Sequence, residues 1–160
     1  MSERAADLAA KLESANAAVI AAFESCSDEQ LGKTCESEGW PVTVAAHHVA
    51  MSHASIAGLA QLIANGQQVP PITMDMINAG NAQHAKEFAN VSREETLALL
   101  RKEGQAAVEL VRGLSDEQLD RTAPMAFAGG AEWSAADVIE RVLIGHPTQH
   151  GESIRAVAAS

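Results

Sequence analysis

The sequence predicts an all-α protein, a bundle of helices with long connecting loops, in one domain that spans residues 1–160. Aromatic residues make up 3% of the chain, and there is no tyrosine. Alanine, which is plentiful, is the strongest helix former, whereas aromatic and β-branched residues favour strands. Apolar residues also recur at steps of three and four along most of the chain, which is the period of a helix with one buried face.

Residues 3–25 carry the clearest amphipathic pattern and are expected to form a long first helix. Its apolar stripe comprises Ala5, Leu8, Ala9, Leu12, Ala15, Val19, Ile20 and Phe23. A polar turn follows and ends at Pro41, a favourable residue for the first turn of a helix. The second helix is expected to run from there to about Gly66, and Thr43 can also cap it.

A third helix is predicted over residues 73–89, where the apolar pattern is weaker, after a loop at 66–71. Ser92 and Glu95 have the spacing of a capping box, in which each side chain satisfies a free N–H of the first turn. The sequence therefore predicts a further helix that begins at Ser92 and continues to about Leu114.

Residues 115–132 contain a proline and a pair of glycines, so they are expected to form a long connection, with 125–127 extended. Ser134 and Asp137 then repeat the helix-start signal. They predict a final helix that ends near Ala158.

The chain contains an internal repeat. The sequence Ser-Asp-Glu-Gln-Leu occurs at 27–31 and again at 115–119, and each copy leads through a loop to a tryptophan, Trp40 or Trp133. Two copies are too few for a solenoid, so the repeat favours a bundle of two paired units. The alternative is that a common capping sequence has arisen twice by chance.

Charge and cysteine content exclude several classes of function. The formal net charge of -10 disfavours binding to nucleic acid or to anionic lipid, because both depend on basic surfaces. Cys26 and Cys35 are too few for a disulfide framework, and the first residues lack the layout of a secretory signal. We therefore expect a cytoplasmic protein that acts on a small-molecule substrate.

The second helix has no charged face, because no Asp, Glu, Lys or Arg occurs between Glu38 and Asp75. A helix without charge is expected to be buried nearly all round. Its histidines, serines, Gln61 and Asn65 make a membrane span improbable. Packing inside the bundle on one side and against a second subunit on another explains the pattern, so the sequence predicts a homodimer.

Two histidines near the C-terminus, His146 and His150, are the strongest candidates for a functional site. An i, i+4 pair points both side chains to one face of a helix, as two ligands of a divalent ion require. They share a stripe with Ile139, Leu143 and Ile154. Buried imidazoles lose their hydrogen bonds to water, so a metal or a hydrogen-bond network must compensate. Histidines with satisfied hydrogen bonds are the alternative, since the spacing by itself is a weak motif.

His48 is the expected third ligand, because its stripe on the second helix carries larger apolar neighbours than the stripe of His47. His53 is a further candidate. Counted from the tryptophans, it occupies in the first unit of the repeat the position that His146 occupies in the second. The residue types alone leave His47, His48 and His53 open.

Gly39 and Trp40 lead into a helix with His48 eight residues beyond the tryptophan, and the last helix carries His146-Pro147-Thr148-Gln149-His150 with Ile154 four residues further on. With these elements in this order, nearly the whole chain resembles the DinB family of the DinB/YfiT-like superfamily. The resemblance implies a four-helix bundle, often dimeric, in which His48, His146 and His150 hold one divalent metal, with zinc or nickel expected.

The related proteins include thiol-dependent transferases and a mycothiol-dependent maleylpyruvate isomerase. The resemblance thus implies an enzyme that joins a low-molecular-weight thiol, as cofactor, to a small electrophile. Three imidazole ligands leave coordination positions for water or substrate, as in catalytic rather than structural sites. A metal-dependent hydrolase and a non-catalytic, stress-related or ligand-binding bundle are the alternatives.

Pro147 lies between the two proposed ligands of the last helix. A proline inside a helix removes one backbone hydrogen bond and clashes with the carbonyl four residues earlier, here that of Leu143, so a kink is expected there. If the chain stopped at His146 and restarted at Pro147, the imidazoles of His146 and His150 would diverge.

Overall fold

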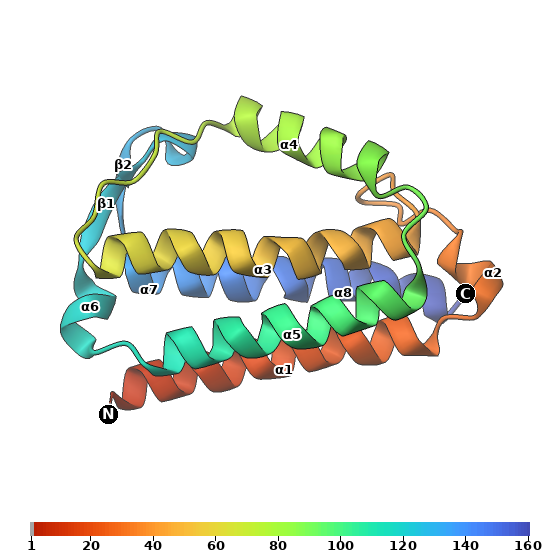
Figure 1. Ribbon diagram of the computed structural model, residues 1–160, viewed down its shortest axis with the longest axis horizontal. Helices are drawn as coiled ribbons and strands as arrows, with labels where there is room; N and C mark the ends of the chain where they lie inside the picture. Colours follow the sequence, from red (N-terminus) through yellow and green to blue (C-terminus); the bar gives the residue numbers. More distant parts are fainter. Residues whose placement is uncertain (1) are drawn as a thin grey trace.

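The computed structural model describes residues 2–160 and shows four long helical rods that run side by side (Figure 1). They are α1 (Glu3–Ser25), α3 (Val42–Ala64), α5 (Arg93–Arg112) and a C-terminal rod made of α7 (Ala135–Val138), η2 (Ile139–Ile144) and α8 (Gly145–Ala158). Both α1 and α3 contact α5 and α8, so the rods close into a bundle. The predicted all-α four-helix bundle is confirmed.

Short elements connect the rods. They are α2 (Asp28–Leu31), α4 (Met74–Glu87), α6 (Asp116–Asp120), β1 (Thr122–Met125), the 3-10 turn η1 (Ala126–Ala128) and β2 (Ala131–Ser134). α4 carries the chain back along the bundle, so α3 and α5 run in the same direction (Figure 1). The expected long connection after α6 contains an antiparallel β1–β2 hairpin. Of residues 125–127, only Met125 is extended, because a 3-10 turn follows it.

The two copies of the internal repeat have the same local structure. In both, the serine and glutamine of the repeated sequence form a capping box at the start of a short helix, α2 or α6. Both copies also pair a threonine with the residue that follows the tryptophan, through a bridge from Thr34 to Pro41 and a strand pair of Thr122 with Ser134. The predicted capping boxes of α5 and α7 are formed as well. Shared structure at matching positions favours a true duplication over chance.

The expected disturbance around Pro147 takes the form of a π-helical segment, η2, which includes Leu143 and ends three residues before the proline. A π turn is wider than an α turn, so it relieves the clash between the proline ring and the preceding backbone. The helix does not stop at His146, because α8 runs without a break from Gly145 to Ala158. The alternative in which the two imidazoles diverge is therefore wrong.

A polar layer crosses the middle of the bundle between two apolar clusters. On each of α1, α3 and α5 the layer is occupied by one residue, Asn16, His53 or Gly104, with apolar cluster residues on either side. On the C-terminal rod the same interval, between the buried Leu143 and Ile154, carries the paired histidines. The candidate site is therefore placed where the apolar core is interrupted.

The charge-free helix α3 is the most deeply buried rod over its first half, where residues 44–50 are all buried. Later in α3, Met51 is 42% exposed. The next helix along the chain, α4, has no buried residue. The single chain thus leaves part of α3 exposed, and burial of that part by a second subunit stays a prediction. Among the described residues, no helix combines the length and the apolar character that crossing a membrane would require.

Candidate metal centre

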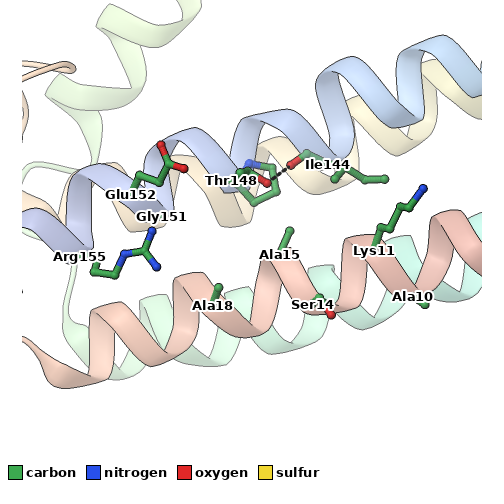
Figure 2. A pocket seen from close by; sticks show the side chains of 11 residues that line it. Ala10, Lys11, Ser14, Ala15, Ala18, Ile144, Thr148, Gly151, Glu152 and Arg155 are labelled. Atoms are coloured by element: carbon green, nitrogen blue, oxygen red, sulfur yellow. Dashed lines mark hydrogen bonds between the residues drawn. The ribbon is translucent and has the colours of Figure 1, made fainter.

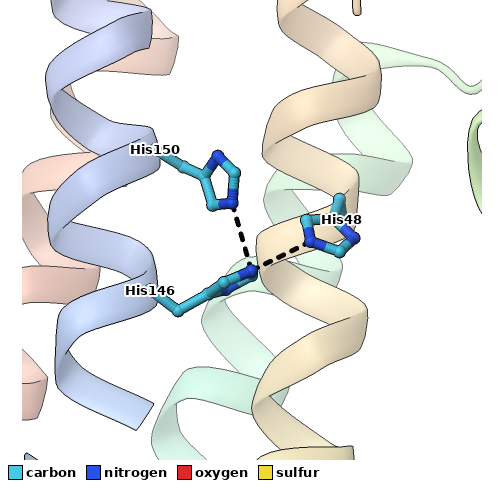
Figure 3. A group of neighbouring side chains, drawn as sticks. All are labelled: His48, His146 and His150. Carbon is cyan, nitrogen blue, oxygen red and sulfur yellow. Dashed lines mark hydrogen bonds between the residues drawn. The ribbon is translucent and has the colours of Figure 1, made fainter. Parts of the chain in front are cut away.

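Three histidines from two rods meet inside the bundle. His48 comes from α3, and His146 and His150 come from one face of α8, on successive turns (Figure 3). The Nε2 atom of His146 lies 2.9 Å from Nε2 of His48 and 3.1 Å from Nε2 of His150. One ring nitrogen from each residue lies within 4.8 Å of the other two. The structure thus brings together the three histidines that the sequence singled out.

Burial keeps the imidazoles of His48 and His146 neutral at physiological pH. The loss of water around His48 lowers its pKa to about 3, and the neighbouring His150, His84 and His47 lower it further. Burial likewise lowers the pKa of His146, with His150 and His48 adding to the effect. A neutral imidazole keeps the lone pair that binds a metal, whereas a protonated ring has none.

The arrangement of nitrogen atoms fits a single divalent ion. Two imidazole nitrogens bound to one tetrahedral zinc ion lie about 3.3 Å apart, since each Zn–N bond is about 2.0–2.1 Å long. The two separations at His146, 2.9 and 3.1 Å, are close to this value. Converging lone pairs repel one another unless a hydrogen or a cation lies between them. Among residues 2–160, Nδ1 of His146 is buried and finds no hydrogen-bond partner, so the cluster also lacks a complete hydrogen-bond network.

A carboxylate that sequence reasoning missed contacts the cluster. Oε1 of Glu38 lies 2.6 Å from Nδ1 of His150, and the Glu38 side chain is only 5% exposed. A carboxylate accepts hydrogen bonds, so Nδ1 of His150 donates, and its Nε2 is left to face His146. The available signal was indirect: Glu38 is the last charged residue before the charge-free stretch and stands two residues before Trp40.

A second pair of histidines borders the cluster on the side of α4. Nδ1 of His47 lies 2.8 Å from Nε2 of His84, and both rings pack against Phe88. Burial lowers the pKa of His84 to about 4, and the nearby His47 lowers it further. The ring of Trp40 meets His48 edge-on at 5.1 Å between centroids. The three-histidine cluster is thus flanked by aromatic rings.

The structure places the two other candidates for the third position outside the cluster. His47 turns towards α4, as described above. His53 lies deeper, where its Nε2 atom donates to Oδ1 of Asn16 at 2.8 Å. His53 is 1% exposed, and burial lowers its pKa to about 4. Of the three alternatives that the residue types left open, only His48 joins His146 and His150.

A cavity of about 530 Å³ lies between α1 and the C-terminal rod (Figure 2). Small residues line most of it, including Ala15, Ala18 and Gly151, and its charged groups are Lys11, Glu152 and Arg155. None of the six histidines lines it. The cavity therefore offers one carboxylate, that of Glu152, and no imidazole or thiol, so the candidate site is the histidine cluster.

Comparisons with known proteins agree with this fold. YfiT from Bacillus subtilis, described as a probable metal-dependent hydrolase with an unusual four-helix bundle topology, superimposes with a TM-score of 0.78 and 22% identity, over 99% of this chain and 89% of that one. An uncharacterized protein from Clostridium difficile 630 gives a TM-score of 0.71 and 17% identity, over 98% and 96% of the two chains. No curated protein matches the chain.

The sequence also matches a family model. The model describes the DinB superfamily, and the match extends over residues 11–154, from the first half of α1 to the end of the polar layer on α8. It therefore includes the loop of Glu38 and all three histidines of the cluster. The chain belongs to the DinB superfamily.

Proposed function

We propose that this protein is a divalent-metal-dependent enzyme in which His48, His146 and His150 hold the ion. The observation that carries the proposal is the convergence of three Nε2 atoms from α3 and α8 on one point inside the bundle. Within the described residues no thiolate or carboxylate joins the set as a further ligand, so a bound ion would keep coordination positions for water or substrate. Such an ion would lower the pKa of a thiol or a water molecule bound to it, which supplies a nucleophile near pH 7.

The residues around the ion have separate tasks in this proposal. His48 and His146 are kept neutral by burial, so they bind the metal without losing a proton first. In this proposal the ring of Trp40 shields His48 from bulk water, and the ring of Phe88 shields the neighbouring His47–His84 pair. The net charge of -10 repels nucleic acid phosphates, so a small molecule is the fitting substrate. A nucleophile bound to the ion would attack an electrophilic one.

For the reaction, we favour transfer of a low-molecular-weight thiol to a small electrophile, or a thiol-dependent isomerisation. The support is the sequence resemblance to a family that includes thiol-dependent enzymes. This resemblance lies in the order of Trp40, His48 and the final pair of histidines. Zinc or nickel is the expected ion, because imidazole suits both. The second candidate is a metal-dependent hydrolase, which is favoured by the description of the B. subtilis protein of similar fold.

Metal analysis tests the site. Protein purified without a histidine tag is expected to contain one divalent ion per chain, and the double variant His146→Ala, His150→Ala is expected to contain none. Gln149→Ala, an exposed change on the same helix, is the matched control and should keep the metal. A wild-type protein without metal, or a double variant that retains it, would contradict the proposal.

A screen of small thiols and electrophiles then separates the reaction classes. Turnover that requires both metal and thiol supports the transferase or isomerase. Hydrolysis that proceeds without any thiol supports the second candidate. A metal-loaded protein that turns over nothing in either screen would support a non-catalytic, ligand-binding bundle instead.

We also propose that the protein is a cytoplasmic homodimer. Met51, Met74 and Met76 are exposed on and near the charge-free part of the chain, which gives a second subunit an apolar surface to cover. Both cysteines are free and buried, as suits a reducing compartment. Sedimentation that shows a monomer at micromolar concentration would contradict the dimer, and cell fractionation tests the compartment.

A further inference from the structure

Glu38 is the one acidic side chain among the described residues that contacts the three-histidine cluster, and it does so from a different segment of the chain. It lies in the loop between α2 and α3, whereas its partner His150 lies on α8, at the opposite end of the sequence. The contact is short, at 2.6 Å between Oε1 and Nδ1, and both side chains are largely buried, with exposures of 5% and 13%.

The loop holds the Glu38 carboxylate in place. The backbone N–H of Cys35 donates to the carbonyl of Trp40 at 2.8 Å, and the N–H of Gly39 donates back to the carbonyl of Cys35 at 2.9 Å. Gly39 has a φ of 72°, a conformation that side chains disfavour. The Cys35 side chain is fully buried in the apolar core beneath the turn. Glu38 therefore sits inside a turn that is fixed on both sides.

This placement costs stability. Oε2 of Glu38 is buried and has no hydrogen-bond partner in the part of the chain that the structure describes. A buried carboxylate with one oxygen unsatisfied is unfavourable compared with an apolar side chain of similar size. A residue retained only to pack the loop against α8 would not need to be charged.

The internal repeat supports the same conclusion. Counted from the tryptophans, the counterpart of Glu38 in the second unit is Ala131, which has no polar side chain. His150 stands 17 residues after its tryptophan, and the residue 17 after Trp40 is Ala57. A π segment adds one residue to a helix, and when that residue is not counted the counterpart is Ile56. The paired-unit architecture thus forms in the other half without this hydrogen bond, so the pair is not required by the fold.

We propose that Glu38 is the positioning residue for metal binding: its carboxylate holds the proton on Nδ1 of His150, and the Nε2 lone pair is thereby directed at the ion. Metal-bound histidines commonly donate their second N–H to a carboxylate, which fixes the tautomer and the ring orientation and makes the ligand more basic. This inference rests on the proposed metal site. It adds a fourth residue that acts through His150 and does not bind the ion itself.

The test measures zinc affinity rather than activity. Full-length protein without a tag is titrated with zinc against a chromophoric chelator, for wild type, Glu38→Met, Glu38→Gln and Glu36→Met. Methionine fills the buried space without an acceptor, glutamine restores an uncharged acceptor, and Glu36 is an exposed residue of the same loop. We expect a loss of about 10–100-fold in affinity for Glu38→Met, a smaller loss for Glu38→Gln and no change for Glu36→Met.

A structural role for Glu38 gives a different pattern. If the side chain only ties the loop to α8, Glu38→Met lowers the melting temperature of the metal-free protein and leaves the zinc affinity within about twofold of wild type, which overturns the proposal. We expect the reverse, with the metal-free variant at least as stable as wild type. Nitrogen NMR of the imidazoles adds a direct signature, because the Nδ1–H form of His150 should dominate in wild type and lose that dominance in Glu38→Met.

Failure of this inference is distinguishable from failure of the proposed function. A wild-type protein that binds zinc tightly, together with a Glu38→Met variant that binds it equally tightly, overturns the role of Glu38 alone. A wild-type protein that binds neither zinc nor nickel overturns the metal site and the role of Glu38 together.

Discussion

His53 and Asn16 form a hydrogen bond in the centre of the bundle, with 2.8 Å between Nε2 and Oδ1. The amide of Asn16 also donates, through Nδ2, to the backbone carbonyl of Leu100 at 3.0 Å. One asparagine thus links α3, α1 and α5 at the level of the polar layer. Because both contacts are buried, they cannot be replaced by water without opening the bundle.

Replacement of Asn16 is the first prediction. Asn16→Ala leaves the buried His53 N–H without a partner and removes the second hydrogen bond of the Leu100 carbonyl, which keeps its bond within α5, so we expect the free energy of unfolding to fall by about 1–3 kcal/mol. Ser14→Ala on the same helix is exposed and should change it by less than about 0.5 kcal/mol. Urea denaturation measures both variants. Equal stability of the two would show that the buried network contributes nothing.

Gly104 gives the second prediction, because it provides the space that Asn16 occupies. A Cβ atom at Gly104 would lie 2.1 Å from Nδ2 of Asn16, which is a clash, so Gly104→Ala should destabilise the protein by about 1–3 kcal/mol. At Gly58 in α3 a Cβ would meet nothing within 4 Å, so Gly58→Ala should stabilise by up to about 1 kcal/mol through helix propensity.

The double variant Asn16→Ala, Gly104→Ala checks the cause. If the clash with the amide explains the loss, the cost of Gly104→Ala shrinks once the amide is removed, and the two changes are not additive. Additive costs in urea denaturation would mean that Gly104 acts through some other contact.

The third prediction is that protonation of His53 in the unfolded chain lowers the stability of the protein at acidic pH. Burial lowers the pKa of His53 to about 4, whereas an unfolded histidine titrates near 6.5. Between these values the unfolded chain binds a proton that the folded chain does not, so stability is fully present above about pH 6.5 and is lost as the pH falls towards 4. His53→Gln keeps a donor for Asn16 but does not titrate.

Denaturation of metal-free protein between pH 7 and pH 5 tests this prediction. Wild type should lose more stability over that interval than His53→Gln, because the variant lacks one proton-binding group in the unfolded state. Parallel curves for the two proteins would mean that His53 does not sense pH.

The sequence predicted those parts of the molecule that depend on local signals. The capping boxes at Ser92 and Ser134 begin helices as expected, and the repeated capping sequence marks two units of similar structure. The stripe that carries His146 and His150 placed both on the inner face of α8, because an i, i+4 spacing fixes relative direction regardless of partners.

The remaining features depend on contacts between distant segments. Glu38 and His150 are far apart in the sequence, and no local pattern pairs a loop carboxylate with a helix imidazole. His53 could not be assigned to the core or to the metal from residue type alone, since its partner Asn16 is on another rod. Pro147 signalled a disturbance in the helix, but a proline predicts only that the helix is disturbed, and the sequence did not predict that the disturbance would be the π segment η2.

The last prediction uses the two tryptophans as reporters of metal binding. The ring centroid of Trp40, just before the start of α3, lies 5.1 Å from that of His48. Trp133 belongs to β2, which lies near the other end of α3 (Figure 1). There its ring packs against Phe127 and beneath the guanidinium of Arg141. Nickel is paramagnetic and quenches a fluorophore that is close to it. In Trp133→Phe, where Trp40 is the only fluorophore, we therefore expect added nickel to quench the emission in proportion to the ion bound.

The complementary variant Trp40→Phe retains only the distant Trp133 and should respond weakly to the same additions. Adding His146→Ala and His150→Ala to Trp133→Phe should abolish the response, because the ion then has one histidine of the cluster left to bind. Strong quenching of Trp133 with little quenching of Trp40 would place the bound nickel at the hairpin end of the bundle and away from the three histidines.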